Sequence, residues 1–470
     1  MSRAFRPASV LAPGLIAAMS RLSRRSFLTA STATAAVPAL AQPKRIVPPE
    51  EPRFSFLDVV IVGAGAAGIA AARRLAAARL RVAVVEAAAQ VGGRCVTDTT
   101  SFDVPFDRGA HWIHMPQINP LARLATQTGL DIYPAPPGQQ IRIGRRYARE
   151  GELEDYLAGL VRATTAIREA ARGRIDISCA QALPKDLGEW RPMIEFVLGP
   201  FGCAKDLAEV SAMDFARSSE RDVDAFCRQG FGTLLAKLAA DVPAQLSTRV
   251  TRVDYGGRLG CEVATSRGEL RARAVIVTVS TNVLLSGRIA FDPDLPKRHL
   301  DATARLKLGS YDHVALEIGG NPFALRADEI VFEKSSGPRT ASLLANTAGS
   351  TLCVVDVAGG FGRDLAAKGE QEMIAFALDW LVGLYGSGFR NAVKRSRATR
   401  WNQEPTVLGA FSAASPGGQG ARRALMEPVR NRVWFAGEAV HETLWGTVGG
   451  AWESGEVAAD SVVRTLTGRR

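Results

Sequence analysis

Three glycines and one acidic residue have the types and spacing of a nucleotide-binding turn. Gly63, Gly65 and Gly68 form a G-x-G-x-x-G motif, and Glu86 follows Gly63 by 23 positions. Gly63 permits a tight turn, Gly65 lets the backbone approach a pyrophosphate, and Gly68 lets a helix pack close to a strand. A carboxylate at the position of Glu86 accepts hydrogen bonds from ribose hydroxyls. This stretch therefore predicts the binding of a dinucleotide.

The segments around the motif are the elements that such a turn requires. Residues 57–62 are mostly aliphatic, as in a strand buried on both faces, and residues 81–85 predict a second buried strand. The Ala-rich run between them predicts a helix. Its first turn, which includes Ala67, directs free N–H groups and the positive end of the helix dipole at the phosphates. The predicted fold class is α/β, with a Rossmann-like dinucleotide-binding domain.

Two more stretches after the second strand carry residues suited to the same ligand. Gly92 and Gly93 permit another close approach of the backbone, and Arg94 can balance the charge of a pyrophosphate. The sequence Gly-Ala-His-Trp-Ile-His then occupies residues 109–114.

In this order, the three motifs resemble the flavin-dependent amine oxidases. That family includes monoamine oxidases, polyamine oxidases and flavin-type histone demethylases, and GAHWIH is similar to the acetylpolyamine oxidase branch. The resemblance implies FAD rather than NAD, and it places His114 near the substrate. A hydrogen-bonded structural histidine is the alternative for His114. The implied FAD contacts in this stretch are Gly109, Ala110, His111 and Trp112.

Later motifs extend the resemblance over about residues 56–468. By that resemblance, Val250 offers its backbone to the adenine, and Trp401 packs near the flavin ring. Ala410 stands where monoamine oxidases have the cysteine that binds FAD covalently. We therefore expect FAD to be bound without a covalent link.

The last part of the chain supplies the predicted walls of the substrate site. Phe411 stands at one wall of the family's aromatic cage, and Thr447 replaces the second cage tyrosine. Trp445 either substitutes for that tyrosine or belongs to the core. The resemblance also implies that a helix beginning here stabilises negative charge at flavin N1 and C2=O. The implied cofactor contacts are Gly437, Glu438, Thr447 and Val448.

His313 departs from the family pattern. In the family, a Leu-Gly turn is followed, after three residues, by a lysine that holds a water against flavin N5. Counted from Leu308 and Gly309, the lysine position falls on His313. A histidine can also hold a water, but it is charged only when protonated. We expect His313 to hold this water, and the electron acceptor, O2 or a carrier, stays open.

The resemblance also predicts how the chain is divided. Residues 56–119, 228–290 and 396–470 are expected to form the FAD-binding domain. Residues 120–227 and 291–395 are expected to form an interleaved α+β substrate domain.

The first 41 residues predict an export signal. Ser23 to Leu28 reads SRRSFL, which resembles the twin-arginine signal, and an Ala-Leu-Ala sequence ends at Ala41. Residues 42–55 are rich in proline and charge and predict a linker. We expect recognition by the twin-arginine translocase and a periplasmic location, with translation starting at Met1 or Met19.

Composition narrows the class of protein. The chain has 470 residues, of which 47% are hydrophobic, and a formal net charge of +11. Five of these charges are arginines of residues 1–41, which leaves +6 on the rest, so nucleic-acid binding is not indicated. No apolar run reaches the ~20 residues of a membrane span. The six cysteines are scattered, and neither a metal site nor a disulfide framework is predicted.

Together these features predict oxidation of an amine C–N bond by hydride transfer to flavin N5, followed by hydrolysis of the imine. The predicted partners are a small-molecule amine and either O2, which would give H2O2, or an electron carrier. A flavin amine dehydrogenase, an L-amino-acid oxidase and a non-catalytic flavin-binding protein are the alternatives. No oligomeric state is predicted.

Overall fold

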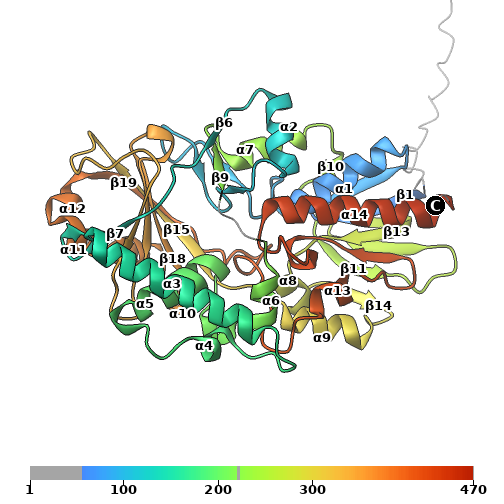
Figure 1. Cartoon of the computed structure of the whole chain (residues 1–470). Coiled ribbons are helices and arrows are strands. Elements are labelled where there is room, and N and C mark those ends of the chain that lie inside the picture. Colours follow the sequence, from blue (N-terminus) through green and yellow to red (C-terminus); the bar gives the residue numbers. More distant parts are fainter. Residues whose placement is uncertain (1–55, 220–222, 469–470) are drawn as a thin grey trace, which may run out of the picture. The chain divides into compact units, whose positions relative to one another are not determined.

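The computed structural model describes residues 56–219 and 223–468 (Figure 1). The predicted signal segment 1–41 and linker 42–55 lie outside the described residues. Within the described ranges, none of the helices has the length and apolar character needed to cross a membrane. All six cysteines lie in these ranges as buried free thiols.

The strand before the glycine motif lies inside an eight-stranded sheet. Strand β1 pairs in parallel with β2 on one side and with β13 on the other. In order, the strands are β10 (Ala244–Gln245), β2 (Val82–Val85), β1 (Leu57–Val62), β13 (Gly268–Val277), β12 (Cys261–Thr265), β11 (Val250–Asp254) and β14 (Ala290–Asp292), with β20 (Val433–Phe435) paired to β13.

Both faces of this sheet are covered, which explains the aliphatic run of residues 59–62 in β1. Val59 and Ile61 pack in a core with helices α1 (Ala66–Ala77) and α14 (Val448–Thr467). Val60 and Val62 point to the opposite face because side chains alternate along a strand. There they share a core with α9 (Lys297–Arg305) and α13 (Ala421–Met426).

Helices α1 and α14 lie side by side although they come from opposite ends of the described chain (Figure 1). Arg74 of α1 pairs with Asp460 of α14 at 2.6 Å. Nearer the helix starts, a Cβ atom on Gly455 would lie 2.1 Å from the carbonyl oxygen of Ala67. Only a glycine permits this approach, and it brings α14 against the first turn of α1.

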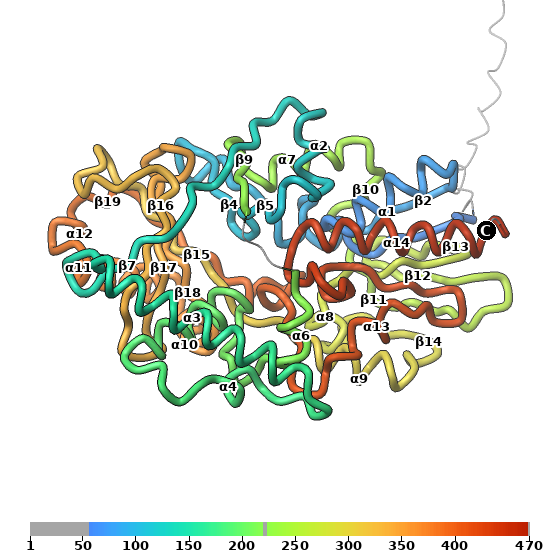
Figure 2. Tube along the Cα trace, viewed as in Figure 1, coloured from blue at the N-terminus to red at the C-terminus, as the bar shows by residue number. Residues whose placement is uncertain are grey.

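A second, seven-stranded sheet forms the other part of the fold (Figure 2). It is antiparallel except where β16 pairs in parallel with β7. In order, its strands are β19 (Val393–Ala398), β15 (Tyr311–Ile318), β18 (Leu352–Ala358), β17 (Ser342–Ala345), β16 (Glu329–Glu333), β7 (Gln140–Ile143) and β8 (Arg146–Tyr147).

Helices cover both faces of this sheet. On one face, α10 (Gly359–Lys368) and α11 (Glu370–Tyr385) pack against Val314, Leu316 and Val355. On the other face, Phe332 and Ile141 pack with α3 (Glu150–Ala170) and α5 (Arg191–Phe196). The remaining named strands are short. They are β3 (Thr97–Asp98) with β4 (Phe106–Asp107), and β5 (Ile113–His114), β9 (Asp224–Cys227) and β6 (Ile132–Pro134) in a three-stranded sheet.

The two sheets draw on separate segments of the chain, although one predicted boundary falls too early. Strand β14 pairs with β11 of the first sheet. Leu295, Ala302 and Leu306 are buried in the core under that sheet, together with α13. Residues 291–306 therefore belong structurally with the first sheet, and the segment that builds the second sheet begins after Leu306 rather than at residue 291.

The contact between α1 and α14 can be tested with a single methyl group. We expect Gly455→Ala to lower the free energy of unfolding by about 1–3 kcal/mol, because the added Cβ meets backbone that cannot move without separating the helices. Gly383→Ala is the matched control, since it lies within α11 and an added Cβ there meets nothing within 4 Å. This control should stabilise by about 0.5–1 kcal/mol. Equal effects in urea unfolding would contradict the close-contact interpretation.

Candidate active site

One large chamber joins the two parts of the fold. Its volume is about 1850 Å³, above the roughly 300–1,000 Å³ of an ordinary small-molecule pocket, which leaves room for a dinucleotide and a second molecule. Every residue predicted for the site lines this chamber except Gly68. These are Gly63, Gly65, Ala67, Glu86, Gly92, Gly93, Arg94, Gly109, Ala110, His111, Trp112, His114, Val250, His313, Trp401, Phe411, Gly437, Glu438, Trp445, Thr447 and Val448.

The glycine turn has the geometry that the sequence predicts. Gly63 has a φ of 107°. A Cβ on Gly68 would lie 2.0 Å from the carbonyl oxygen of Gly63. A Cβ on Gly65 would meet no protein atom within 4 Å, so this backbone is open to a ligand. No side chain caps α1, which leaves the N–H groups of its first turn available to a phosphate. The turn therefore fits a dinucleotide.

Glu86 lines the chamber beside the glycine turn. One carboxylate oxygen accepts a hydrogen bond from the Ala64 N–H at 2.7 Å, and the other accepts one from the Ala88 N–H at 2.8 Å. Burial raises the pKa of Glu86, and these backbone bonds oppose the shift. Each carboxylate oxygen keeps further acceptor capacity, so the side chain can still receive a ribose hydroxyl.

Glu438 is more completely engaged than the sequence suggests. Its carboxylate accepts hydrogen bonds from Arg94 at 2.8 Å, from the Ser412 hydroxyl at 2.7 Å and from the Gly446 N–H at 3.0 Å. The same Arg94 nitrogen donates to the carbonyl of Ala410 at 2.6 Å. The Glu438 side chain thus joins segments of the protein, and the predicted contact of this residue with the cofactor stays a prediction.

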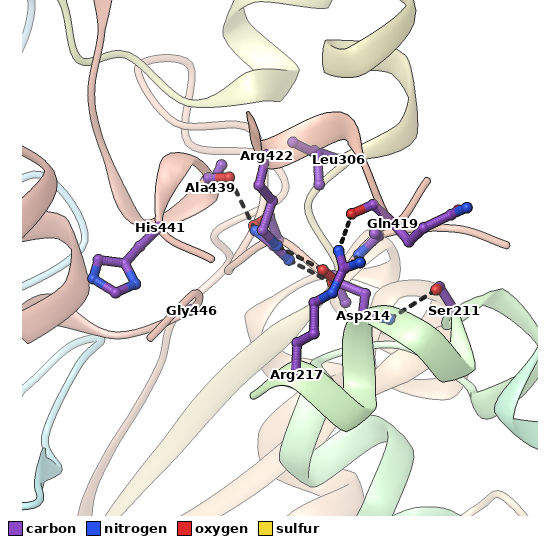
Figure 3. Close-up of polar contacts among 12 residues, drawn as sticks. Ser211, Asp214, Arg217, Leu306, Gln419, Arg422, Ala439, His441 and Gly446 are labelled. Atoms are coloured by element: carbon purple, nitrogen blue, oxygen red, sulfur yellow. Dashed lines mark hydrogen bonds and ion pairs between the residues drawn. The ribbon is translucent and has the colours of Figure 1, made fainter. Parts of the chain in front are cut away.

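A buried ion pair that the sequence analysis missed supports the same corner (Figure 3). Asp214 of α6 (Ala212–Arg217) faces Arg422 of α13 and accepts two hydrogen bonds from it, at 2.8 and 2.7 Å. The side chains are 1% and 2% exposed. Arg422 also donates to the Ser412 hydroxyl at 3.1 Å, and its guanidinium lies 4.9 Å from the ring centre of Trp445. The pair therefore positions one wall of the chamber.

Aromatic side chains form the walls near Phe411. The ring of Tyr311 lies 6.0 Å from Phe411 and 6.2 Å from Phe201, and Phe201 lies 5.0 Å from Phe332. Tyr311 was missed although it precedes His313 by two positions, the spacing that places two strand residues on one face. Phe201 ends a π-helical turn, Val197–Phe201, that contains Pro200. Such turns often occur at functional sites.

Thr447 is a helix cap in this structure. Its hydroxyl accepts a hydrogen bond from the Gly450 N–H at 2.9 Å and donates to the Leu444 carbonyl at 2.7 Å. The hydroxyl is thereby used within the protein, so Thr447 shapes the chamber through its position at the start of α14. The predicted contact of Thr447 and Val448 backbone with the flavin stays a prediction.

His114 is paired with an acid that was not predicted. Asp224 lies directly opposite it, on β9 against β5, and the His114 Nδ1 lies 2.6 Å from a carboxylate oxygen. Both residues line the chamber. The carboxyl group of Asp224 is therefore placed where a substrate can reach it.

His313 does not have the surroundings expected of a water-holding residue. Its Nε2 lies 2.8 Å from the carbonyl oxygen of Gly109, and its Nδ1 lies 2.5 Å from the carboxylate of Asp356. Both ring nitrogens already have protein partners, so the geometry does not support the water-holding role. Burial lowers the pKa of His313, but Asp356, the Gly109 carbonyl and Asp312 together outweigh it and raise the pKa.

The other predicted contacts also line the chamber. Trp401 donates from its indole nitrogen to the Arg108 carbonyl at 2.8 Å, and a Cβ on Gly109 would lie 3.0 Å from the Trp401 ring. Val250 is buried in β11 at the chamber wall. Ala410 also lines the chamber, and its methyl group offers no nucleophile for a covalent bond to a flavin.

A dinucleotide cradle that opens directly into an aromatic chamber defines a cofactor-dependent oxidoreductase. The model of the flavin-containing amine oxidoreductases matches residues 66–463, and the chain belongs to this family. The protein is accordingly an FAD-dependent enzyme, as the sequence resemblance implied.

Individual relatives are distant. The chain is 27% identical over 439 residues to polyamine oxidase 4 of Oryza sativa, covering 86% of this chain and 88% of that protein. It is 26% identical to lysine-specific histone demethylase 1 homolog 2 of the same plant. The chain spans only 59% of the length of that protein. Cyclohexylamine oxidase from Brevibacterium oxydans and putrescine oxidase bound to putrescine share the fold. Each has a TM-score of 0.73 and 21% identity, over 88% of this chain and 100% of theirs.

The ion pair beneath Trp445 predicts a large effect from a small substitution. Asp214→Asn leaves the Arg422 charge buried without a counter-ion, so we expect the free energy of unfolding to fall by about 3–5 kcal/mol. Asp301→Asn, which breaks an exposed pair with Lys297, should cost less than about 0.5 kcal/mol. Chemical denaturation of both variants measures the difference. If Asp214→Asn is as mild as the control, the pair does not hold this corner together.

Proposed function

We propose that the protein oxidises the carbon–nitrogen bond of a small amine, with O2 as the acceptor of the electrons. The observation that carries the proposal is the continuous chamber, in which the dinucleotide cradle opens into walls of Phe201, Tyr311, Phe332 and Phe411. FAD supplies the site that accepts a hydride from the α-carbon of the amine. The resulting imine is then hydrolysed by water, and reduction of O2 by two electrons and two protons gives H2O2.

The residues of the chain contribute binding and orientation. Aromatic walls exclude water, and such an environment disfavours the charged form of an amine, so it promotes the neutral form from which hydride can leave. The start of α14 lines the chamber at Val448, and a helix N-terminus stabilises negative charge that develops beside it. No side chain of the chain has to act as a covalent nucleophile.

The substrate class is an amine that combines an apolar body with one or two cationic ends. Asp224 is a chamber-lining carboxylate, and it offers a partner for a second ammonium group. Relatives named polyamine oxidase and putrescine oxidase support a diamine or polyamine, and a relative named cyclohexylamine oxidase supports a monoamine.

One other electron acceptor and one other substrate class are candidates. A dehydrogenase that passes electrons to a carrier is favoured by the absence of lysine at position 313. An L-amino-acid oxidase is favoured by Arg168, whose position in the chamber wall could serve a substrate carboxylate.

A panel of substrates tests the activity. The purified protein should be yellow, and acid precipitation should release the colour into the supernatant, as expected for FAD without a covalent link. Putrescine, a longer polyamine, cyclohexylamine and an L-amino acid are then added without oxygen, and bleaching is followed. We expect an amine to bleach the enzyme and the amino acid to fail. Admission of air should restore the colour and produce H2O2 in equal amount.

A variant at Asp224 serves as the control for this substrate panel. Asp224→Asn should raise KM for putrescine by roughly tenfold relative to cyclohexylamine, which corresponds to about 1.4 kcal/mol. Bleaching by the amino acid alone would replace the proposal by the amino-acid oxidase. Bleaching by no compound would contradict catalysis, and colour restored only by an artificial electron acceptor would favour the dehydrogenase.

We also propose that the folded enzyme is exported by the twin-arginine route, on the strength of the Arg24-Arg25 pair. This route carries folded proteins and so permits FAD to load before transport. Arg24→Lys combined with Arg25→Lys should retain the protein in the cytoplasm with FAD bound. Fractionation of cells checks the location, with Arg3→Lys and Arg6→Lys as the charge-matched control. Unchanged export of the double variant would eliminate this route.

A further inference from the structure

The contacts of His313 define its charge as well as its orientation. Its Nε2 lies 2.8 Å from the Gly109 carbonyl oxygen, which can only accept a hydrogen bond. Its Nδ1 lies 2.5 Å from a carboxylate oxygen of Asp356. An ionised carboxylate likewise only accepts hydrogen bonds. A ring with acceptors at both nitrogens carries a proton on each of them, which is the imidazolium form.

The second oxygen of Asp356 is consistent with an ionised carboxylate. It accepts a hydrogen bond from the Tyr311 hydroxyl at 2.9 Å. Burial, and then the charge of Asp356, raise the pKa of Tyr311, so this hydroxyl keeps its proton and acts as the donor. Strand pairing produces the cluster, because Asp356 of β18 lies directly opposite His313 of β15 and diagonally from Tyr311.

The ion pair has a defined direction. His313 lines the large chamber, whereas Asp356 does not. Asp356 instead borders a separate cavity of about 20 Å³, which His313 also lines, together with Asp107 and His111. The pair carries no net charge, but its positive end faces the chamber and its negative end faces away.

The other charged groups around the ring strengthen this arrangement. Asp312 neighbours His313 in the same strand and is largely buried, and burial raises its pKa to about 6 despite hydrogen bonds from Trp401 and Thr399. Asp107 is held by the Nδ1 of His111 at 2.8 Å. No cation is among the groups that perturb His313. Every charged neighbour with a resolved influence on the ring favours its protonated form.

We infer that Asp356 is a positioning residue that holds His313 as an imidazolium in the wall of the flavin chamber. A fixed positive end beside the flavin lowers the energy of the reduced, more negative cofactor through Coulomb attraction. This consequence rests on the proposed oxidase function, in which a lysine would otherwise supply the charge. Unlike a histidine that titrates near ~6.5, this one should remain charged through the neutral range.

The state of the ring can be measured without any substrate. The chain contains five histidines, so an ¹H–¹⁵N long-range correlation spectrum of histidine-labelled protein shows five imidazoles, and His313→Gln assigns the relevant one. We expect both nitrogens of His313 to be protonated at pH 8 in the wild type. A neutral tautomer at pH 8 in the wild type would overturn the inference, whether or not the protein oxidises amines.

Variants then test the part played by Asp356. In Asp356→Asn, His313 should become neutral at pH 8. Asp224→Asn is the matched control, because it removes the acid of the other histidine–carboxylate pair in the chamber and should leave the His313 signals unchanged. If Asp356→Asn does not fold, Tyr311→Phe removes a hydrogen bond that stabilises the negative charge of Asp356. This variant should raise the pH at which His313 loses its proton, because the carboxylate left behind is less stable. No change in that pH would contradict the cluster.

The reduction potential of bound FAD gives the second readout, and its sign is decisive. If His313 is an imidazolium, Asp356→Asn abolishes the ion pair and should lower the potential at pH 8. In acid the difference from wild type should reverse, because His313 of the variant then regains its proton beside a neutral side chain. If His313 is neutral, the same substitution removes a lone negative charge and raises the potential. Inactivity towards every amine, combined with a lowered potential, would reject the proposed function and retain the ion pair. An unchanged potential would make the pair purely structural.

Discussion

The burial of one carboxylate organises the junction between the cofactor cradle and the rest of the chamber. Glu438 is 5% exposed, and a carboxylate at that depth is stable only when donors surround it. Its donors come from the Gly-Gly-Arg loop, from Ser412 and from the turn before α14. Ser412 in turn contacts Arg422, whose charge is balanced by Asp214. Opposite charges alternate along this chain of contacts, so each group compensates the burial of the next.

This arrangement explains why the chamber can be large and still well defined. Phe411 and Trp445 flank the network rather than the centre of either sheet. Their positions depend on polar contacts that have direction, which apolar packing alone does not provide. Trp445 is fixed against the guanidinium of Arg422. The cofactor side and the substrate side of the chamber therefore share one set of supports, although they are built from segments far apart in the sequence.

The sequence predicted the parts of the site that depend on local chain geometry. A glycine turn between a strand and a helix is specified by neighbouring residues, so Gly63, Gly65 and Glu86 could be placed without a structure. Asp356 and Asp214 could not, because each meets its partner only through strand pairing or helix packing over a long separation in sequence. The family pattern placed His313 in the chamber wall but gave no information on what lies behind it. The boundary near residue 290 was missed for the same reason, since the pairing of β14 with β11 is not a local property.

The π-helical turn before Phe201 has a consequence for how this protein can change over evolution. A turn of this type holds one residue more than an α-helical turn. Each residue of a helix advances the side-chain direction by about 100°, as follows from 3.6 residues per turn. Loss of a single codon in 197–201 would therefore swing Phe201 away from Tyr311 and Phe332 without breaking the surrounding helix. The cross-section of the substrate chamber can thus change in one genetic step, while the cofactor cradle, carried by other segments, stays intact.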